Sequence, residues 1–486
     1  MTKTKKIPDL EINTKKKIVF FASESAPFIA TGGLADVIGS LPKALAKNKF
    51  NDVSVFIPLY SQIKQEFRDK FKFLTSFNVS VGWRWQYVGV FYYKYQGVKY
   101  YFIDNEYYFK REGNIYGFYD DGERFAYFSR ASLDALSKLN VYPDILHCND
   151  WQTASSIIYL KGMYYGDENY RKIKTVFTIH NIEYQGIFSE FTFADLFGFP
   201  NNLWNTVEFD GNVNLMKGAI EMTDILSTVS PSYANELKDA YYAHRLENII
   251  KNNSHKLHGI LNGIDVDYYN PTKDKFIFKN YSKKDLSGKA VCKKELQKML
   301  SLPENPNVPI IAIISRLVSH KGLDLVKATI ENLLTKDVQI IILGKGETSY
   351  ENFFNHIAYC YKGKCACIIE FNQDLSRKIY SGADLFLMPS KMEPCGLSQM
   401  IASRYATVPI VRETGGLNDS IKSFDGKNGN GFTFKDYNAH DMLYVINKAV
   451  DLYQDKEKWN IVVKNAVTSD FSWKVQAKKY ENLYDL

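Results

Sequence analysis

The chain contains 486 residues, of which 45% are hydrophobic and 24% are charged, so it is long enough for two globular domains with separate cores. Much of its formal net charge of +7 comes from lysine-rich stretches such as Lys3, Lys5, Lys6 and residues 15–17, and no arginine-rich stripe indicates binding to nucleic acid. Six cysteines without C-x-x-C spacing are too few for a disulfide framework and complete no zinc site. With no signal peptide or membrane-spanning run, the sequence predicts a cytoplasmic protein without a membrane partner.

Short apolar runs alternate with helical segments in the first half of the chain, which is typical of α/β domains with parallel sheets. The predicted strands there are 18–22, 53–57, 145–147, 175–179, 225–229 and 260–261. A stretch from about residue 71 to 109 alternates Val, Trp and Tyr around a Gln96-Gly97 turn and predicts inserted antiparallel hairpins. The 34 Tyr and 32 Phe residues of the chain either fill aromatic cores or offer surfaces that stack on sugar rings.

A second set of strands follows an interval from about residue 268 to 307 that is rich in Lys, Asn, Ser and Pro and predicts surface and linker. The later strands are predicted at 309–314, 338–343, 367–370, 385–388 and 409–411. We therefore expect an α/β protein with two doubly wound domains, the first over residues 1–267 and the second, with its linker, over 268–469.

Polar, charged or glycine residues follow nearly every predicted strand, at the edge where open parallel sheets bind their ligands. Polar residues are common in any loop. Their presence after nearly every predicted strand is more consistent with two facing rims of one ligand-binding cleft than with ordinary loops. The segments at these strand ends are Glu24 with 31–33, 149–151, 180–181, 230–231, 262–263, 315–316, 344–346, 390–396 and 413–416.

Three of these segments indicate specific chemistry. Gly32-Gly33 lets the backbone approach a ligand closely at the start of a helix, as anion binding requires. Arg316 and Lys321 can clamp a diphosphate, with forked hydrogen bonds from one and a point charge from the other. Glu393 precedes a Pro-Cys-Gly turn, and its carboxylate can accept hydrogen bonds from sugar hydroxyls.

Other functions fail on spacing. Gly344-Lys345-Gly346 lacks the Walker A framework, and no G-x-G-x-x-G follows the first strand, which disfavours nucleotide hydrolysis and NAD binding. Asp265-Val266-Asp267 resembles a metal-binding D-x-D motif, but it directly follows Leu261-Asn262-Gly263 and is better interpreted as a turn. No G-x-S-x-G of a serine hydrolase is present.

From about residue 17 to the C-terminus, the order of these segments resembles the bacterial glycogen synthase and plant starch synthase family. The segments that carry the resemblance are 31–37 (TGGLADV), 149–152 (NDWQ), 177–181 (FTIHN), 229–231 (VSP), 261–265 (LNGID), 315–317 (SRL), 320–323 (HKGL), 389–390 (PS), 393–397 (EPCGL), 414–417 (TGGL) and 470–473 (DFSW).

The resemblance implies a GT-B fold, with two Rossmann-like domains facing across a cleft and a C-terminal helix, residues 470–486, that returns to the first domain. It implies retaining transfer of glucose from ADP-glucose to the non-reducing end of an α-1,4-glucan such as glycogen, without a metal or another cofactor. No side chain is an obvious covalent nucleophile, which agrees with a same-face mechanism.

Site residues follow from the resemblance position by position. Arg316 and Lys321 would neutralise the departing diphosphate, and Asp150, His180 and Glu393 would hold the glucosyl ring and complete the catalytic set. Further donor contacts would come from Thr31, Gly32, Gly33, Asn262, Cys395, Gly396, Leu397, Thr414, Gly415 and Gly416.

Three positions depart from the family pattern. Ala30 stands where the family often has a phosphate-binding Lys, Asn149 replaces a frequent His, and residues 242–246 replace a glycine-containing loop. Loss of that Lys removes roughly 1–3 kcal/mol of charge-assisted bonding unless Lys321, Arg316 or Arg245 compensates. Two alternatives therefore stay open: a catalytically weakened glucan-binding relative, and a GT-B transferase that uses UDP-glucose.

Overall fold

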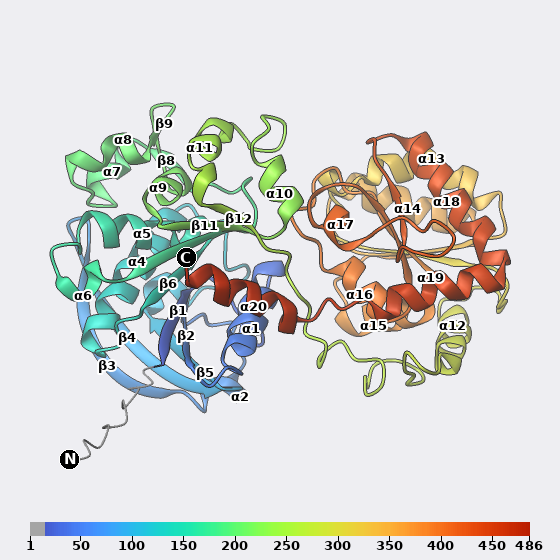
Figure 1. Ribbon diagram of the computed structural model, residues 1–486, viewed down its shortest axis with the longest axis horizontal. Helices are drawn as coiled ribbons and strands as arrows, with labels where there is room; N and C mark the ends of the chain where they lie inside the picture. Colours follow the sequence, from blue (N-terminus) through green and yellow to red (C-terminus); the bar gives the residue numbers. More distant parts are fainter. Residues whose placement is uncertain (1–14) are drawn as a thin grey trace, which may run out of the picture. The chain divides into compact units, whose positions relative to one another are not determined.

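The computed structural model describes residues 15–486, which divide into two compact units (Figure 1). The first unit contains the chain up to Thr178, Tyr184–Leu226 and Glu481–Leu486, and the second contains Ile179–Glu183 and Ser227–Tyr480. Lys3, Lys5 and Lys6 of the basic N-terminal stretch lie outside the described residues. The domain boundaries given above, at residues 267 and 470, stay predictions.

The central sheet of the first unit runs in the order β7-β6-β1-β2-β5-β4-β3. From β7 to β5 the neighbouring strands are parallel, and they are largely buried because helices and loops cover both faces. Their bounds are β1 (Lys16–Phe21), β2 (Asn51–Pro58), β5 (Val98–Asp104), β6 (Ile145–Asn149) and β7 (Lys174–Ile179). Because β1 has β2 on one side and β6 on the other, the chain reverses direction across the sheet between β1 and β6.

The aromatic stretch forms antiparallel pairs at one edge of this sheet. β3 (Lys72–Val81) pairs with β4 (Arg84–Tyr95), and β4 pairs with β5 through a turn at Gln96-Gly97. Both turn residues have positive φ, 49° and 89°, as a tight hairpin with right-handed twist requires. Since β5 also pairs in parallel with β2, these strands continue the main sheet. A small separate sheet contains β8 (Ile187–Ser189), β10 (Asn212–Asn214) and β9 (Glu208–Phe209).

The helices of the first unit connect these strands. They are α1 (Gly33–Leu45), α2 (Gln65–Arg68), α3 (Glu106–Phe109), α4 (Asp121–Lys138), α5 (Trp151–Gly162), α6 (Glu168–Arg171), α7 (Thr192–Asp195), α8 (Trp204–Val207) and α9 (Leu215–Met222), with a 3-10 turn η1 (Asn201–Leu203). α1 begins at Gly33, with Gly32 as its N-cap residue, and α5 begins directly after Asp150. Both helices therefore start at strand ends that the sequence singled out.

The second unit contains a parallel sheet in the order β15-β14-β13-β16-β17-β18, which is the Rossmann order 3-2-1-4-5-6. The strands are β13 (Ile310–Ile314), β14 (Gln339–Leu343), β15 (Cys365–Ile368), β16 (Leu385–Met388), β17 (Val408–Arg412) and β18 (Phe432–Phe434). The predicted second doubly wound α/β sheet is confirmed, with strands β13 to β17 close to the predicted positions and β18 not predicted. β11 (Ile225–Thr228) leads the chain into this unit, and β12 (Leu257–Gly259) follows.

Helices lie on both faces of the second sheet (Figure 1). The helices of the second unit are α10 (Pro231–Glu236), α11 (Glu247–Asn252), α12 (Ser287–Met299), α13 (Leu323–Leu334), α14 (Thr348–Cys360), α15 (Gln373–Gly382), α16 (Ser398–Arg404), α17 (Gly415–Ser420), α18 (Ala439–Gln454), α19 (Lys456–Thr468) and α20 (Trp473–Tyr484), whose last residues belong to the first unit, with 3-10 turns η2 (Ser254–Lys256) and η3 (Ser319–Lys321). One hydrophobic core joins residues such as Ile313, Leu325 and Phe354 between sheet and helices.

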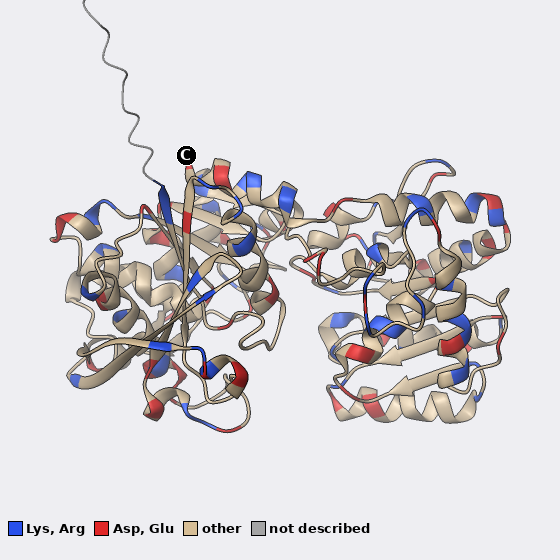
Figure 2. Cartoon of the chain, turned by 90° about the horizontal axis from the view of Figure 1, so that it is seen from below, with Lys and Arg blue, Asp and Glu red and all other residues tan. Residues whose placement is uncertain are grey.

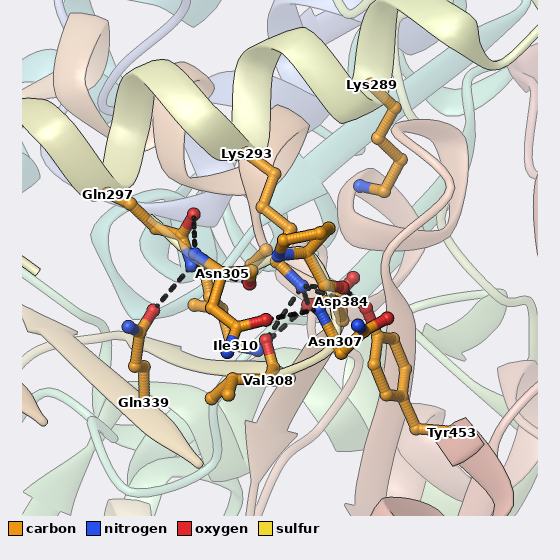
Figure 3. A network of polar contacts seen from close by, with 12 residues as sticks. Lys289, Lys293, Gln297, Asn305, Asn307, Val308, Ile310, Gln339, Asp384 and Tyr453 are labelled. Carbon is orange, nitrogen blue, oxygen red and sulfur yellow. Dashed lines mark hydrogen bonds and ion pairs between the residues drawn. The ribbon is translucent and has the colours of Figure 1, made fainter. Parts of the chain in front are cut away.

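Helix α12 lies inside the interval that the sequence predicted as surface and linker. A buried polar network fixes it to the amino ends of the strands (Figure 3). Lys293 on α12 contacts Asp384 at 2.8 Å and donates to the Val308 carbonyl at 2.8 Å, while Gln297 donates to Gln339 at 2.9 Å. The lysines of this helix suggested solvent, but Lys293 is buried, because a carboxylate and carbonyls satisfy its ammonium group.

The last residues of the chain belong to the first unit. The Tyr484 hydroxyl shares a hydrogen bond of 2.9 Å with His147 of β6, and Glu481 accepts hydrogen bonds from Asn48 and Asn51. Lysine and arginine are interspersed with aspartate and glutamate over both units (Figure 2). Within residues 15–486, no helix is both long and apolar enough to cross a membrane.

Candidate functional site

Strand order decides which of the predicted loops meet in the second unit. β13 and β16 are neighbours, although β14 and β15 lie between them in sequence. The crevice beyond the carboxyl ends of such a pair is where doubly wound sheets bind ligands. Arg316 follows β13 and Glu393 follows β16, so the fold brings these two predicted segments to one edge.

Lys321 and Glu393 form a close ion pair at that edge. The distance from Lys321 Nζ to Glu393 Oε2 is 2.6 Å, and the Ser390 hydroxyl donates to the same oxygen at 2.9 Å. Glu393 is buried and Lys321 is half-buried. The turn before α13 packs tightly here, since a Cβ on Gly322, which has φ +72°, would lie 2.0 Å from the Pro389 carbonyl oxygen. That contact fixes Lys321 beside the loop that carries Glu393.

Positive charge gathers around His320. Burial lowers the pKa of His320, and the neighbouring charges of Lys321 and Arg316 lower it further. The imidazole is therefore neutral at physiological pH. Arg316 itself is exposed. Its backbone is held by the 344–346 loop, because Leu317 donates to the Lys345 carbonyl at 3.0 Å.

The loop from Glu393 to Gly396 has every carbonyl group occupied. Gly416 N donates to the Glu393 and Pro394 oxygens at 3.2 and 3.1 Å, and the Ser230 hydroxyl donates to Pro394 O at 2.6 Å. Gln399 Nε2 donates to the Cys395 and Gly396 oxygens at 3.2 and 3.0 Å. In contrast, no described residue accepts a hydrogen bond from the N–H groups of 395–397. The loop therefore offers backbone donors and no acceptors.

Asn262 lies against this loop. Its amide side chain and backbone contact the Cys395 thiol, whose pKa burial raises to about 12. Asn262 is buried, yet its Oδ1 has no hydrogen-bond partner among the described residues. An orphaned buried acceptor costs free energy unless a ligand or water satisfies it. Asn262 is thus suited to accept a hydrogen bond from a bound molecule, and the predicted donor contact through it stays a prediction.

Thr414, Gly415 and Gly416 already have partners inside the second unit. The Thr414 hydroxyl and Gly415 N donate to Glu236 Oε1 at 2.9 and 2.8 Å. A Cβ on Gly415 would lie 2.0 Å from Glu393 O, and one on Gly416 would lie 2.2 Å from Cys395 O. These glycines are required by chain packing, and the predicted donor contact through them stays a prediction.

Gly32 and Gly33 of the first unit, in contrast, have room for a side chain. A Cβ on either would meet no atom within 4 Å, and Gly32 has φ −163°, which any residue adopts. Both residues are exposed. Since neither the backbone nor packing within the described chain requires glycine, the space above this turn is available for close approach by another molecule.

Buried Glu24 holds the turn from below. It accepts hydrogen bonds from the Thr31 N–H at 2.6 Å and from the Thr31 hydroxyl at 2.9 Å. Burial raises the pKa of Glu24 to about 7 against these hydrogen bonds, and the charge of Asp36 raises it further. The sequence named Glu24 only as a strand-end residue, because its partner becomes apparent only once the turn folds back.

Asp150 has a strained backbone. Its φ of 54° and ψ of −179° place it in a region that residues other than glycine rarely occupy, at a cost of about 1–3 kcal/mol. Asp150 N donates to Thr178 O at 3.0 Å on the neighbouring strand, and Thr153 accepts from Asn149 N at 2.6 Å. Such strain persists where surrounding contacts impose it, and it is common at functional sites.

His180 follows β7 and is assigned to the second unit. Burial lowers the pKa of His180 to about 3, so the imidazole is neutral at physiological pH. A neutral imidazole presents one donor and one acceptor nitrogen, which suits hydrogen bonds to hydroxyl groups.

The loop that lacks the family glycine keeps a glycine-like backbone. His244 and Arg245 have φ values of 47° and 77°, both in the left-handed region. Each such residue costs on the order of 1 kcal/mol when it is not glycine. Two consecutive residues of this loop thus adopt a backbone conformation that favours glycine.

The possible D-x-D metal motif is a turn, as the sequence indicated. Asp265 Oδ1 accepts hydrogen bonds from Asp267 N at 2.9 Å and from Tyr268 N at 3.0 Å. In residues 15–486, no group of three or more His, Cys, Asp or Glu side chains is arranged to hold a metal ion.

Sequence reasoning missed Ser390 as a partner of Glu393, and it missed Glu236 altogether. Ser390 lies within the predicted segment 390–396, so its closeness in sequence to Glu393 could have indicated their contact. Glu236 gave none, because its partners Thr414 and Gly415 lie about 180 positions away in the chain.

Two units that each contain a parallel, helix-flanked sheet with ligand-type loops at its carboxyl edge have the architecture of a GT-B glycosyltransferase. Comparison with known proteins agrees. Residues 17–252 match the family described as "Starch synthase catalytic domain", and residues 295–466 match "Glycosyl transferases group 1".

Individual relatives span nearly the whole chain. A glycogen synthase of Clostridium acetobutylicum is 50% identical over 96% of this chain and 99% of its own, and one of Anoxybacillus flavithermus is 48% identical over 96% and 97%. The solved catalytic domain of starch synthase IV from Arabidopsis thaliana, bound to ADP and acarbose, is 34% identical with a TM-score of 0.90, over 97% of this chain and 99% of that one. The chain belongs to the glycogen synthase and starch synthase family of glycosyltransferases.

The two kinds of glycine make a testable contrast. We expect Gly416→Ala to destabilise the protein by about 1–3 kcal/mol, because its Cβ would overlap the Cys395 carbonyl oxygen. Gly33→Ala, the matched control in open space, should change stability by less than about 0.5 kcal/mol. Urea unfolding of both variants measures the difference, and equal midpoints would contradict the assignment.

Glu24 predicts a pH dependence of stability. Its pKa of about 7 in the folded chain exceeds the ordinary 4.5, so the folded state binds the extra proton and stability falls as pH rises through this window. Between pH of about 5 and about 8, wild type should lose on the order of 2–3 kcal/mol more than Glu24→Gln. Urea unfolding across pH tests this, with exposed Glu66→Gln as the control. A Glu24→Gln curve parallel to wild type would refute it.

Proposed function

We propose that this chain is an ADP-glucose-dependent, retaining glycogen synthase that transfers glucose to the non-reducing end of an α-1,4-glucan. The observation that carries the proposal is the group of Arg316, Lys321 and Glu393 at the β13–β16 edge. A GT-B glycosyltransferase needs cations for a nucleotide diphosphate and acceptors for sugar hydroxyls, and this edge supplies both. The starch synthase IV relative was solved with ADP and acarbose, which supports the same substrate types here.

Arg316 and Lys321 are assigned to the diphosphate. The exposed Arg316 can give forked hydrogen bonds to phosphate oxygens, and Lys321 adds a second positive charge. Lys321 is already paired with Glu393 at 2.6 Å, so a bound phosphate would share or replace that carboxylate as its partner. The cations act most strongly on the leaving diphosphate, where negative charge develops during transfer.

The glucosyl ring is assigned to Asp150, His180 and Glu393. Glu393 and Asn262 Oδ1 provide acceptors for sugar hydroxyls, and the N–H groups of 395–397 provide donors. The neutral His180 adds a hydrogen bond without competing for the phosphate charge. Asp150, held in a strained backbone, is suited to a fixed orientation toward the sugar.

In the reaction, the bond between the anomeric carbon of glucose and the ADP oxygen breaks, and a bond to the acceptor 4-hydroxyl oxygen forms on the same face of the ring. The proton of that hydroxyl passes to the departing phosphate oxygen, so no protein nucleophile is consumed. The residues of this chain orient the donor and stabilise the diphosphate. They require no covalent intermediate.

UDP-glucose is the competing donor, and Ala30 in place of the family Lys motivates it. The nucleotide preference can be measured directly. With glycogen as acceptor, we expect ADP-glucose to support nucleotide release at least about ten-fold faster, as kcat/KM, than UDP-glucose, a difference of about 1.4 kcal/mol. Faster turnover with UDP-glucose would overturn the donor assignment, and glycogen co-sedimentation without any nucleotide release would favour the weakened glucan-binding relative.

The diphosphate clamp predicts large kinetic losses. Arg316→Ala and Lys321→Ala should each lower kcat by about 100-fold or more, because each removes a cation from the developing charge. Lys464→Ala, on the exposed face of α19, is the charge-matched control and should keep wild-type turnover. Steady-state ADP release measures all three, and full activity in both site variants would show that the clamp is misassigned.

A further inference from the structure

Helices α10 and α17 are joined by a reciprocal set of hydrogen bonds, which we call the α10–α17 clasp. Asp419 on α17 accepts from the Ser232 N–H at 2.7 Å and from the Ser232 hydroxyl at 2.8 Å, at the start of α10. Glu236 at the end of α10 accepts from Thr414 and Gly415 at the start of α17. Each helix thus supplies a carboxylate to the unsatisfied donors at the beginning of the other.

The clasp is linked directly to the Glu393–Gly396 loop. Its Ser230 donates to the Pro394 carbonyl at 2.6 Å, immediately before α10. At the other helix, Gly416 N donates to the Glu393 and Pro394 carbonyls. Two of the three donors that hold the loop therefore come from segments that the clasp fixes, and the third is Gln399 on α16.

The Glu236 carboxylate is held by hydrogen bonds to the start of α17, at a cost in desolvation. Burial raises its pKa above the ordinary value, while the hydrogen bonds from Gly415 and Thr414 and the charge of Arg412 lower it, in that order of size. Its Oε2 is buried without a partner among the described residues, so only Oε1 holds α17. A buried carboxylate oxygen without a partner lowers the stability of the fold. Such a group is expected where the loss of its hydrogen bonds to a neighbouring segment would cost more.

We propose that Glu236 is a positioning residue for glucosyl transfer. It locks the start of α17, and through Gly416 and the Ser230 side of the clasp it holds the Glu393–Gly396 backbone with its N–H groups free for the sugar. This role presupposes the transfer reaction proposed above. Glu236 is hydrogen-bonded to Thr414 and Gly415, whereas Arg316 and Lys321 follow β13, so the effect of Glu236 should fall on the sugar and spare the diphosphate.

The first test is a kinetic split between two substitutions at one position. Glu236→Ala removes the acceptor and should lower kcat by about ten-fold or more, because small displacements of reacting groups carry costs of that size. Glu236→Gln keeps an oxygen acceptor and should retain kcat within about three-fold. The Kd for ADP, measured by calorimetry, should change by less than about two-fold in both. The exposed Glu331→Ala on α13 is the control.

Three outcomes would overturn the role of Glu236: full kcat in Glu236→Ala, equal loss in Glu236→Ala and Glu236→Gln, or loss of ADP affinity in parallel with kcat. If Glu236→Ala fails to fold, Ser230→Ala removes the hydroxyl on Pro394 from the same clasp. It should then lower kcat by about three- to ten-fold with ADP affinity kept, and unchanged kcat would overturn the proposal.

A second measurement does not depend on activity. Hydrogen exchange of a peptide spanning residues 413–418 should be at least about ten-fold faster in Glu236→Ala than in Glu236→Gln, because the Gly415 N–H loses its acceptor and the Gly416 N–H is no longer held against the loop. Equal exchange in the two variants would overturn the positioning role even if the wild-type protein released no ADP. Absence of ADP release from wild type would instead refute the proposed function.

Discussion

The carbonyl groups of Glu393, Pro394, Cys395 and Gly396 all accept hydrogen bonds from inside the second unit, and the rest of the candidate site depends on this constraint. A four-residue loop has many accessible conformations, each lost at an entropic cost of about 1–2 kcal/mol per residue on ordering. Gly416 N, the Ser230 hydroxyl and Gln399 Nε2 supply the compensating bonds. The loop is thereby rigid before any ligand arrives, with its N–H groups unused.

Close backbone packing makes that arrangement possible. Gly415 and Gly416 approach the loop so closely that a methyl group on either would overlap a carbonyl oxygen. Gly322 does the same against Pro389, which fixes Lys321 beside Glu393. The glycines of the second unit therefore serve the internal fit of the site. In the first unit, by contrast, no atom lies close to a Cβ on Gly32 or Gly33, so these glycines leave room at the surface and do not serve internal packing.

Ionisable side chains near the predicted ligand loops are either paired with an opposite charge or have a shifted pKa. Lys321 is held by Glu393, and His320 stays neutral beside two cations. Glu24, buried under the Thr31 turn, has a pKa of about 7 and is half-ionised near neutrality. Burial therefore sets the protonation state of His320 and of Glu24, each within its own unit.

The sequence alone determined most of the strands and the α/β class, and it named the candidate site residues. Runs of buried β-branched and aromatic residues located most strands of both sheets to within a few positions, since burial on both faces leaves a continuous apolar pattern, but the short β18 was missed. Residues at strand ends, such as Arg316 and Glu393, were found because parallel sheets expose ligand-type loops there. The sequence did not predict helix α12, because a lysine such as Lys293 is usually exposed. Lys293 is buried here through its ion pair with Asp384, which is distant in sequence.

Only the tertiary structure decided that β13 adjoins β16, that Lys321 pairs with Glu393, and that Glu236 holds a turn about 180 positions away. Apolar periodicity is a local property of the chain, whereas hydrogen bonds between distant segments are fixed only when packing brings their partners within about 3 Å.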